Sequence, residues 1–500
     1  MLAEGSASPG RGGRPLSSLP VTLHDPIPLA LSYDDVLLVP RRSSIRSRRD
    51  VDVSTRLTRT LRLAVPVVSA NMDTVTESEM AITMARVGGI GIIHRFLSVE
   101  RQVSEVARVK RAEALVIEDP HTIGPEATAA EAAAEMRRRG VTSLVVVSDG
   151  GLLTGMLTRR DMSLQDDPAA PVGSLMTPRE RLVTAPAGTS GERAAVILRD
   201  ARLEKLPLVH PDGHLAGLIT ARDLRQRAER PEATKDARGR LAVGAAIGVR
   251  GDFLERARAL IDAQADVLVL DIAHGHAERA IAAIGEVREA LGSDVQLIAG
   301  NVVTREGALD LVRAGADGVK VGVGPGSVCT TRVVAGVGLP QLTAVMECAE
   351  VCASEDVPVI ADGGIRAGGD VAKAIAAGAE TVMVGNLLAG TPESPGVVVT
   401  RNGARVKVFR GMASGEAAAA RPVAESEDDT EFIPVVPEGV EAVVPLRDEA
   451  ATVVHQLVGG LRSGMSYSNA HTIPELHHNA RFVRITPGGL RESYPHDVAY

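Results

Sequence analysis

The residues best suited to covalent chemistry lie in the segment 322–332, which reads GVGPGSVCTTR. Its glycines and proline favour a loop whose successive backbone N–H groups can surround a phosphate or an ion. Cys329 follows this loop. A thiol becomes a nucleophile when its thiolate form is favoured, and exposed backbone amides and the charge of Arg332 would favour it. The alternative is a tight turn before a buried cysteine. The polar neighbours Ser327 and Thr331 favour the nucleophile.

The composition also indicates the cellular location of the protein and excludes some classes of binding partner. The other two cysteines, Cys348 and Cys352, lie four residues apart in a helical pattern and have no Cys or His partner at metal-binding spacing. So few cysteines, without a signal-peptide pattern, predict a reducing, cytoplasmic location. A net charge of −8 and an aromatic content of 2% argue against nucleic-acid partners. No apolar run reaches the ~18 residues that a membrane span needs.

The elements that must position Cys329 follow an α/β pattern. The chain has 500 residues, more than one core usually serves, so two domains are expected. Strand, helix and strand alternate from the buried run 64–73 (AVPVVSANMD) to GIGIIH, and the rhythm resumes after residue 228 with runs such as ADVLVLDIAHG and VPVIADGG. About eight such units predict a (β/α)8 TIM barrel. An open doubly wound sheet is the alternative, but its GxGxxG fingerprint is missing.

Polar and glycine residues recur at the carboxyl ends of these strands. In a (β/α)8 barrel the active site forms there, so we expect a single pocket lined by Asp271, Asn301, Cys329, Asp362 and Gly385.

Two copies of one motif interrupt the barrel pattern. The segment 155–161 reads GMLTRRD and the segment 217–223 reads GLITARD, a separation of 62 residues. This predicts a tandem module at 118–227 between the barrel segments 28–117 and 228–500. The module has no nucleophile or metal cluster, so we interpret it as regulatory. The acidic residues at the motif ends could instead cap the following helices.

Two further segments lack the regular spacing of apolar residues that is typical of helices and strands. Residues 1–27 are rich in Gly, Ser, Pro and Arg and predict a disordered tail. Residues 413–434 are acidic and rich in alanine. A long irregular segment next to the active face of a barrel is typical of a mobile flap.

Together these motifs resemble the IMP dehydrogenase/GMP reductase family. The resemblance runs from about residue 28 to 498 and is carried by SANMDTVTE, LDIAHGH, AGNVVT, GVGPGSVCTTR, IADGGI, VGNLLAGTPESPG and VPEGVE. It implies a (β/α)8 barrel that binds a purine 5′-monophosphate, GMP or IMP, in its mouth. The repeat at 118–227 resembles a pair of CBS domains, which bind adenine or guanine nucleotides.

The resemblance assigns roles at the barrel mouth. Cys329 is the nucleophile that adds to purine C2, and Glu438 acting through Thr331 is an acid relay. Asp271 and Asn301 line the nicotinamide side. The substrate is bound by Asn71, Ser327, Asp362, Gly363, Gly364, Gly385, Asn386, Gly411 and Met412. Phe409 stands where the family has a phosphate-binding tyrosine, and Asn386 replaces the usual Gly or Ser.

The resemblance also implies an ion, allosteric ligands and an assembly. A monovalent cation, K+, is held by backbone carbonyls of Gly324, Gly326 and Cys329, with Glu492, Ser493 and Tyr494 of the partner subunit. Regulatory ATP or GTP binds the inserted module at Thr158, Asp161, Thr220 and Asp223. The assembly is a homo-tetramer or an octamer.

The flap separates the two chemistries of the family. Dehydrogenases activate water with an Arg-Tyr pair about a dozen residues before the PEG glutamate; here those positions hold Glu425 and Ser426. The reductase branch is also favoured by Asn71, the segment AGNVVT and Val328. More typical of dehydrogenases are the segment FRGMAS, the ESYPHD tail and the inserted module.

We therefore predict that the chain catalyses NADPH-dependent reductive deamination of GMP to IMP and ammonia, in purine interconversion and salvage. The first alternative is oxidation of IMP to XMP with NAD. The second is a non-catalytic purine-nucleotide sensor. The sequence alone does not decide between NADP and NAD.

Overall fold

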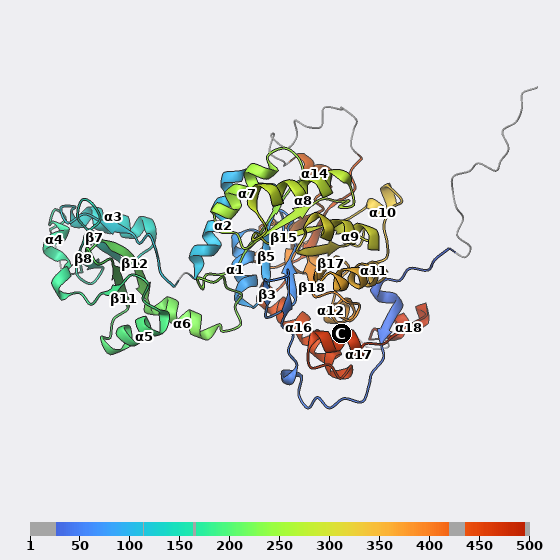
Figure 1. Ribbon diagram of the computed structural model, residues 1–500. Coiled ribbons are helices and arrows are strands. Elements are labelled where there is room, and N and C mark those ends of the chain that lie inside the picture. The colour runs from blue at the N-terminus through green and yellow to red at the C-terminus, as the bar shows by residue number, and fades with distance from the viewer. Residues whose placement is uncertain (1–26, 114, 164–166, 420–435, 496–500) are drawn as a thin grey trace, which may run out of the picture.

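The computed structural model describes residues 27–113, 115–163, 167–419 and 436–495. It shows a barrel body and a smaller module that projects from it (Figure 1). The predicted tail, apart from residue 27, and most of the predicted flap, including Glu425 and Ser426, lie outside the described residues. Within the described residues, no helix combines the length and apolar character needed to cross a bilayer.

Eight parallel strands close into the predicted barrel, in the order β13-β14-β15-β16-β17-β18-β4-β5. They are almost wholly buried, because one face fills the barrel and the other meets the surrounding helices, so they appear in sequence as apolar runs. Their bounds are β4 (Val67–Ser69), β5 (Ile90–Ile93), β13 (Gly244–Ile247), β14 (Val267–Asp271), β15 (Leu297–Val302), β16 (Gly318–Val321), β17 (Val359–Asp362) and β18 (Thr381–Val384). The predicted fold class, a (β/α)8 barrel, is confirmed.

Helices cover the outside of the barrel (Figure 1), and the residues that they bury are mostly apolar. They are α1 (Ser78–Arg86), α2 (Val99–Ala112), α7 (Phe253–Asp262), α8 (Glu278–Leu291), α9 (Arg305–Ala314), α11 (Gln341–Ser354), α12 (Gly368–Ala376) and α16 (Ala450–Tyr467). α16 is 18 residues long and ends at Tyr467. It packs closely on α12, since a Cβ on Gly368 would stand 2.7 Å from the Cα of Gly460.

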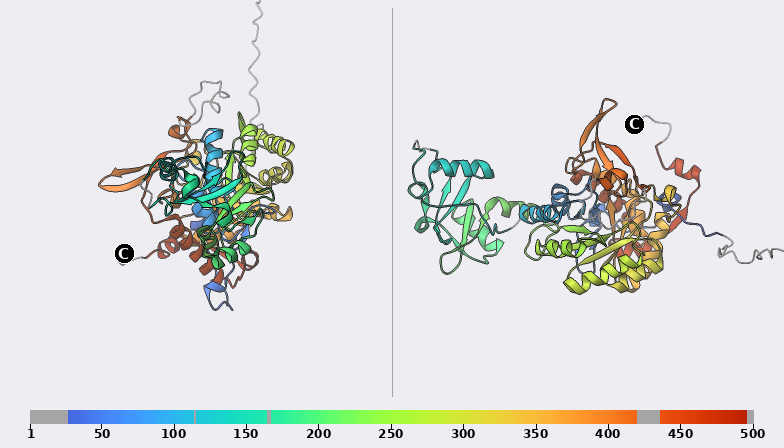
Figure 2. Two further views of the ribbon diagram at one scale, coloured as in Figure 1. Left: turned by 90° about the vertical axis from the view of Figure 1, so that its left-hand side faces the viewer. Right: turned by 90° about the horizontal axis from the view of Figure 1, so that it is seen from above.

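Short elements surround the barrel mouth. They are the turn η2 (Tyr33–Asp35), α10 (Thr331–Val334), α13 (Asn386–Ala389) and α14 (Gly415–Ala419). The antiparallel sheet of β19 (Val398–Arg401), β20 (Ala404–Arg410) and β21 (Glu441–Pro445) leads into and out of the flap, and its β19–β20 hairpin projects from the body (Figure 2). This sheet brings residues 411 and 438, which are distant in the chain, to the same edge of the mouth.

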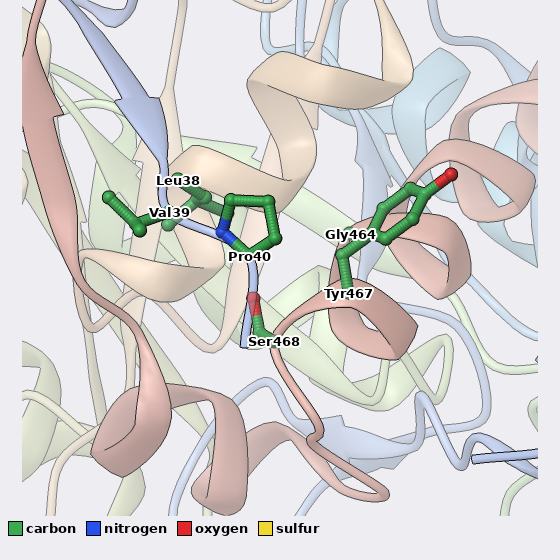
Figure 3. Close-up of a pocket in the computed structure, with 6 residues that line it drawn as sticks. All are labelled: Leu38, Val39, Pro40, Gly464, Tyr467 and Ser468. Carbon is green, nitrogen blue, oxygen red and sulfur yellow. The ribbon is translucent and has the colours of Figure 1, made fainter. Parts of the chain in front are cut away.

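The ends of the described chain are joined on the side of the barrel. β1 (Val36–Leu38) pairs antiparallel with β22 (Phe482–Arg484), between α17 (Ile473–Asn479) and α18 (Pro487–Glu492). A small hollow of about 160 Å³ lies between residues 38–40 and the end of α16 (Figure 3). None of its lining residues is charged. The remaining short elements are η3 (Arg48–Asp50), β2 (Thr55–Arg56) and β3 (Arg62–Leu63).

The inserted module consists of two similar halves. The first contains β6 (Thr122–Ile123), α3 (Ala129–Arg139), β7 (Ser143–Val147), β8 (Leu153–Thr158), α4 (Val172–Leu175), β9 (Thr177–Pro178) and η4 (Arg179–Arg181). The second contains β10 (Ala185–Pro186), α5 (Gly191–Asp200), β11 (Lys205–Val209), β12 (Leu215–Thr220) and α6 (Ala221–Glu229). The hairpins β7–β8 and β11–β12 share their register and shift it at the same place, between Val146 and Val147 and between Leu208 and Val209. The sequence repeat is thus a structural repeat.

Candidate active site

A cavity of about 920 Å³ occupies the mouth of the barrel, at the carboxyl ends of the strands. It brings together every barrel residue predicted to act on the substrate or coenzyme. These are Asn71, Asp271, Asn301, Ser327, Cys329, Thr331, Asp362, Gly363, Gly364, Gly385, Asn386, Gly411, Met412 and Glu438. Their individual roles stay predictions, but the single pocket on which those roles depend is present.

The thiol loop, residues 322–330, connects β16 to the short helix α10. The backbone N–H of Cys329 donates to the carbonyl of Gly326 at 3.1 Å, so the loop folds back just before the thiol. The Sγ of Cys329 lies 3.2 Å from the Oγ1 of Thr331, and the thiol is partly exposed to the cavity. Burial instead raises the pKa of the Cys352 thiol to about 12 and that of Cys348 still further, so neither is a nucleophile.

The segment that carries Glu438 is fixed to the thiol loop by backbone hydrogen bonds. The N–H of Thr330 donates to the carbonyl of Glu438 at 2.9 Å, and the N–H of Val440 donates to the carbonyl of Val328 at 3.0 Å. Cys329 and Gly439 thus form an antiparallel bridge. Within the described residues, no hydrogen bond joins the side chains of Glu438 and Thr331. The acid relay therefore rests on proximity and stays a prediction.

Two glycine turns allow the thiol loop to approach the loop after β17. A Cβ on Gly363 would stand 2.8 Å from the Cγ of Pro325, and Gly363 has φ of +96°, which side chains rarely adopt. A Cβ on Gly322 would stand 2.2 Å from the carbonyl oxygen of Asp362. Only glycine fits at these contacts, which hold Ser327 and the amide of Gly364 on the same cavity.

Sequence reasoning missed Lys320, which lies at the centre of the site. Its side chain is 2% exposed, and its ammonium lies 2.7 Å from Oδ1 of Asp271 and 2.8 Å from Oδ2 of Asp362. It also donates to the side-chain carbonyl of Asn301. One signal was available, because a lysine within a buried parallel strand (DGVKVGVG) is costly without acidic partners.

Electrostatics keep this group of residues charged. Burial opposes the ammonium form of Lys320, but Asp271 and Asp362 more than offset it and raise the pKa of the lysine. Burial likewise opposes the carboxylate of Asp271, yet the lysine charge holds the pKa of Asp271 below its usual value. Asn301 donates to the same Oδ2 of Asp362 at 2.9 Å, which leaves Oδ1 of Asp362 for ligand hydroxyl groups.

Arg332 differs from its expected role beside the thiol. Its side chain lies across Gly324 and Gly338, and Nη2 donates to the carbonyl of Leu339 at 2.6 Å. The described contacts therefore place Arg332 as a brace for the loop, and the expectation that it favours the thiolate has no contact to support it.

The predicted cation site is described only in part. Gly324, Gly326 and Cys329 line the cavity, and backbone carbonyl oxygens are suitable donors for K+. Glu492 ends α18, Ser493 and Tyr494 follow it, and none of the three lines the cavity of its own chain. Among the described residues, no three His, Cys, Asp or Glu side chains are arranged to hold a metal ion.

The Thr-x-x-Asp motifs of the inserted module begin the turns after β8 and β12. In the first, the Thr158 hydroxyl donates to the Asp161 carboxylate at 2.8 Å. In the second, the Thr220 hydroxyl donates to Asp223 at 2.5 Å, and the Asp223 N–H donates back to Thr220 at 3.1 Å. The N-cap of α6 is thus Thr220 and not Asp223, and in the described residues no helix directly follows the first motif. The nucleotide role of the four residues stays a prediction.

A sequence model described as the IMP dehydrogenase / GMP reductase domain matches residues 30–496. The chain belongs to this family, whose enzymes use a nicotinamide coenzyme. Among curated relatives, the chain is similar to a GMP reductase of Leishmania major, 50% identical over 97% of this chain and 99% of that one. It is similar also to an inosine-5′-monophosphate dehydrogenase of Nitrosopumilus maritimus, 49% identical over 94% of this chain and 98% of that one.

Solved structures of GMP reductase from Trypanosoma brucei resemble nearly the whole chain. A cysteine-to-alanine variant of that enzyme in complex with guanosine 5′-monophosphate has a TM-score of 0.89 at 46% identity, covering 95% of this chain and 99% of that one. A complex of that enzyme with guanosine 5′-triphosphate has a TM-score of 0.78 at 42% identity, covering 92% of this chain and 98% of that one.

Proposed function

We propose that the protein is a GMP reductase that converts GMP and NADPH to IMP, ammonia and NADP+. The observation that carries this choice within the family is the absence of an Arg-Tyr pair anywhere in residues 411–438. Hydrolysis of a covalent purine intermediate needs an activated water, and the chain lacks the groups with which the family activates it. The similarity to two GMP reductases supports the choice.

The cavity offers separate groups for each part of GMP. The hydroxyl of Ser327 and the amides of Gly364 and Gly385 bind the phosphate. Asp362, held through Oδ2 by Lys320 and Asn301, accepts hydrogen bonds from the ribose hydroxyls. Met412 and Glu438 border the purine, close to the thiol. Phe409, 2% exposed beside Gly385, supplies apolar packing where the family has a hydroxyl.

The chemistry proceeds through a covalent intermediate at C2. The Cys329 thiolate adds to C2 and forms a C–S bond, and the 2-amino group takes a proton from Glu438 through Thr331 and leaves as ammonia. The coenzyme supplies the hydride that C2 then accepts. The C–S bond breaks, the thiolate returns to Cys329, and IMP carries the new C2–H bond.

The inserted module is proposed to be a CBS pair that binds ATP or GTP and regulates the barrel. The structural repeat and the GTP complex of the T. brucei enzyme support this proposal. The module projects from the body (Figures 1 and 2), where a nucleotide could alter contacts between subunits of a tetramer or octamer. A K+ ion on the carbonyls of Gly324, Gly326 and Cys329 would brace the thiol loop.

The rival function, oxidation of IMP with NAD+, is favoured by the FRGMAS and ESYPHD motifs and by the N. maritimus relative. Absorbance at 340 nm distinguishes the candidates. A GMP reductase consumes NADPH when GMP is added, whereas a dehydrogenase produces NADH from IMP and NAD+. A non-catalytic sensor changes neither signal.

A further inference from the structure

Three arginines line one side of the active-site cavity, and neither the substrate nor the covalent chemistry uses them. Arg95 follows β5, Arg250 follows β13 and Arg279 lies in the first turn of α8, after β14. These three strands are consecutive in the closed barrel. We call Arg95, Arg250 and Arg279 the arginine cluster.

The cluster is gathered around one short segment, residues 248–250. A Cβ on Gly248 would lie 3.4 Å from Nη1 of Arg95, so the Arg95 guanidinium lies against this glycine. Nε of Arg279 donates to the carbonyl of Val249 at 2.6 Å. Arg250 is the next residue, so three guanidinium-bearing side chains meet at a single loop.

The position of the cluster separates it from the phosphate of the mononucleotide. The groups assigned to that phosphate, Ser327, Gly364 and Gly385, follow β16, β17 and β18. In the barrel order, β15 and β4 stand between those strands and the strands of the cluster. Asp271, assigned to the nicotinamide, ends β14 on the cluster side. The cluster therefore faces the second ligand of the reaction, and its charge suits an anionic part of that ligand.

Two of the arginines are held in place and one is available. Arg279 lies 5.1 Å above the ring of Phe253 and pairs with Glu286, with Nη2 3.1 Å from Oε2. Arg95 lies 5.3 Å from the centre of the Phe96 ring. Arg250 is exposed and, within the described residues, forms no ion pair or side-chain hydrogen bond. Arg95 and Arg279 are thus fixed beside the available guanidinium of Arg250, and a guanidinium is suited to bidentate binding of a phosphate.

Two carboxylates next to the cluster, those of Asp252 and Glu286, already have partners. A coenzyme without a 2′-phosphate is typically recognised by an acidic side chain that accepts from the ribose 2′-hydroxyl. Here Asp252 pairs with Arg256 at 2.8 Å, and Glu286 pairs with Arg279. The loop 248–252 thus offers Arg250 as a cation, and its one carboxylate, that of Asp252, has a partner.

We propose that Arg250 binds the 2′-phosphate of NADPH, assisted by Arg95 and Arg279, and that the cluster makes the enzyme select NADPH over NADH. The inference rests on the proposed function, because it assigns the coenzyme of that reaction. It adds a residue that determines specificity.

Steady-state kinetics with both coenzymes provide the first test. In the full-length enzyme with GMP saturating, Arg250→Gln should raise the KM for NADPH about tenfold or more and change the KM for NADH less than twofold, since a charge-assisted contact is lost only with the former. The control is Arg258→Gln, the same charge change on an exposed residue of α7 outside the cavity. An equal rise with both coenzymes would assign Arg250 to the diphosphate, and no rise with either would remove it from the site; each result overturns the proposal.

Binding gives a readout independent of turnover. In Cys329→Ala saturated with GMP, calorimetric titration should show tighter binding of NADP+ than of NAD+, and adding Arg250→Gln should abolish the difference. Equal binding of the two nucleotides before the arginine is changed would contradict the inference. If the native enzyme reduces GMP equally well with NADH, only this inference fails; if it reduces GMP with neither coenzyme, the proposed function fails.

Discussion

The Sγ of Cys329 lies 3.2 Å from the Oγ1 of Thr331, at the point where the thiol loop becomes α10. This contact joins the proposed nucleophile to a hydroxyl that can pass a proton. The bridge between Cys329 and Gly439 brings the Glu438 segment to the same place, so the nucleophile and the proposed acid share one backbone framework.

Removal of the thiol tests the nucleophile. Cys329→Ser should reduce kcat at least about a thousandfold, since a hydroxyl without an activating base is a poor nucleophile. The melting temperature should stay within a few degrees of the native value, because the side chain is only partly buried. Turnover close to the native rate in the folded variant would rule out the covalent mechanism.

Removal of the Thr331 hydroxyl tests the proton relay. Thr331→Val keeps the side-chain shape and should lower kcat by about a hundredfold with little change in the KM for GMP, because the hydroxyl acts in the departure of ammonia. Thr330→Val is the matched control, since Thr330 is the preceding residue and does not line the cavity. An equal loss in both variants would indicate a structural effect on α10.

Lys320 is expected to stabilise the folded site. Lys320→Met leaves the partly buried Asp271 and Asp362 without their cation, which should cost up to about 3–5 kcal/mol of unfolding free energy. Lys320→Arg retains the charge and should recover part of the loss. Chemical denaturation of the three proteins measures the difference; equal unfolding free energies would contradict the role assigned to Lys320.

The same substitution should change the dependence of stability on pH. In the native protein the pKa of Asp271 is depressed, so the stability that its charge provides is present above the carboxylate's unfolded-state pKa and is lost as pH falls through the lower folded-state pKa. Without Lys320, the largest influence that lowers the pKa of Asp271 is lost and only the smaller ones from Arg95 and Asn71 still oppose burial, so that pKa rises relative to the native protein. The melting temperature of Lys320→Met should therefore start to fall at a higher pH than that of the native protein. Plots of melting temperature against pH that run parallel for the two proteins from about pH 2 to about pH 8, a range that brackets the usual carboxylate pKa of about 4, would count against this reasoning.

Gly363 tests the close approach of the two loops. Gly363→Ala places a Cβ against Pro325 at a positive φ and should cost about 1–3 kcal/mol in stability. It should also raise the KM for GMP, because the displaced loop carries Gly364. The control is Gly369→Ala, since a Cβ there meets no atom within 4 Å. Equal effects of the two substitutions would contradict the packing argument.

The barrel could be predicted because its strands are buried on both faces and follow one another along the chain as apolar runs. The residues at their carboxyl ends were predictable for the same reason, since the fold fixes where those ends meet. The inserted repeat was visible because the two Thr-x-x-Asp motifs recur in sequence.

Other parts of the site depend on contacts between distant segments. Lys320 was missed because its partners, Asp271 and Asp362, lie on two other strands. The arginine cluster brings together residues 95, 250 and 279 through the closure of the barrel at β5 and β13. The role expected for Arg332 came from proximity in sequence, whereas in the structure its side chain turns back onto the loop glycines.

The most direct test of the account is absorbance at 340 nm with purified enzyme, in parallel assays with GMP plus NADPH and with IMP plus NAD+. The account predicts a fall in absorbance in the first assay, with one IMP and one ammonia formed for each NADPH consumed, and little change in the second. A rise in absorbance with IMP and NAD+ that yields XMP, together with no GMP-dependent loss of NADPH, would contradict it.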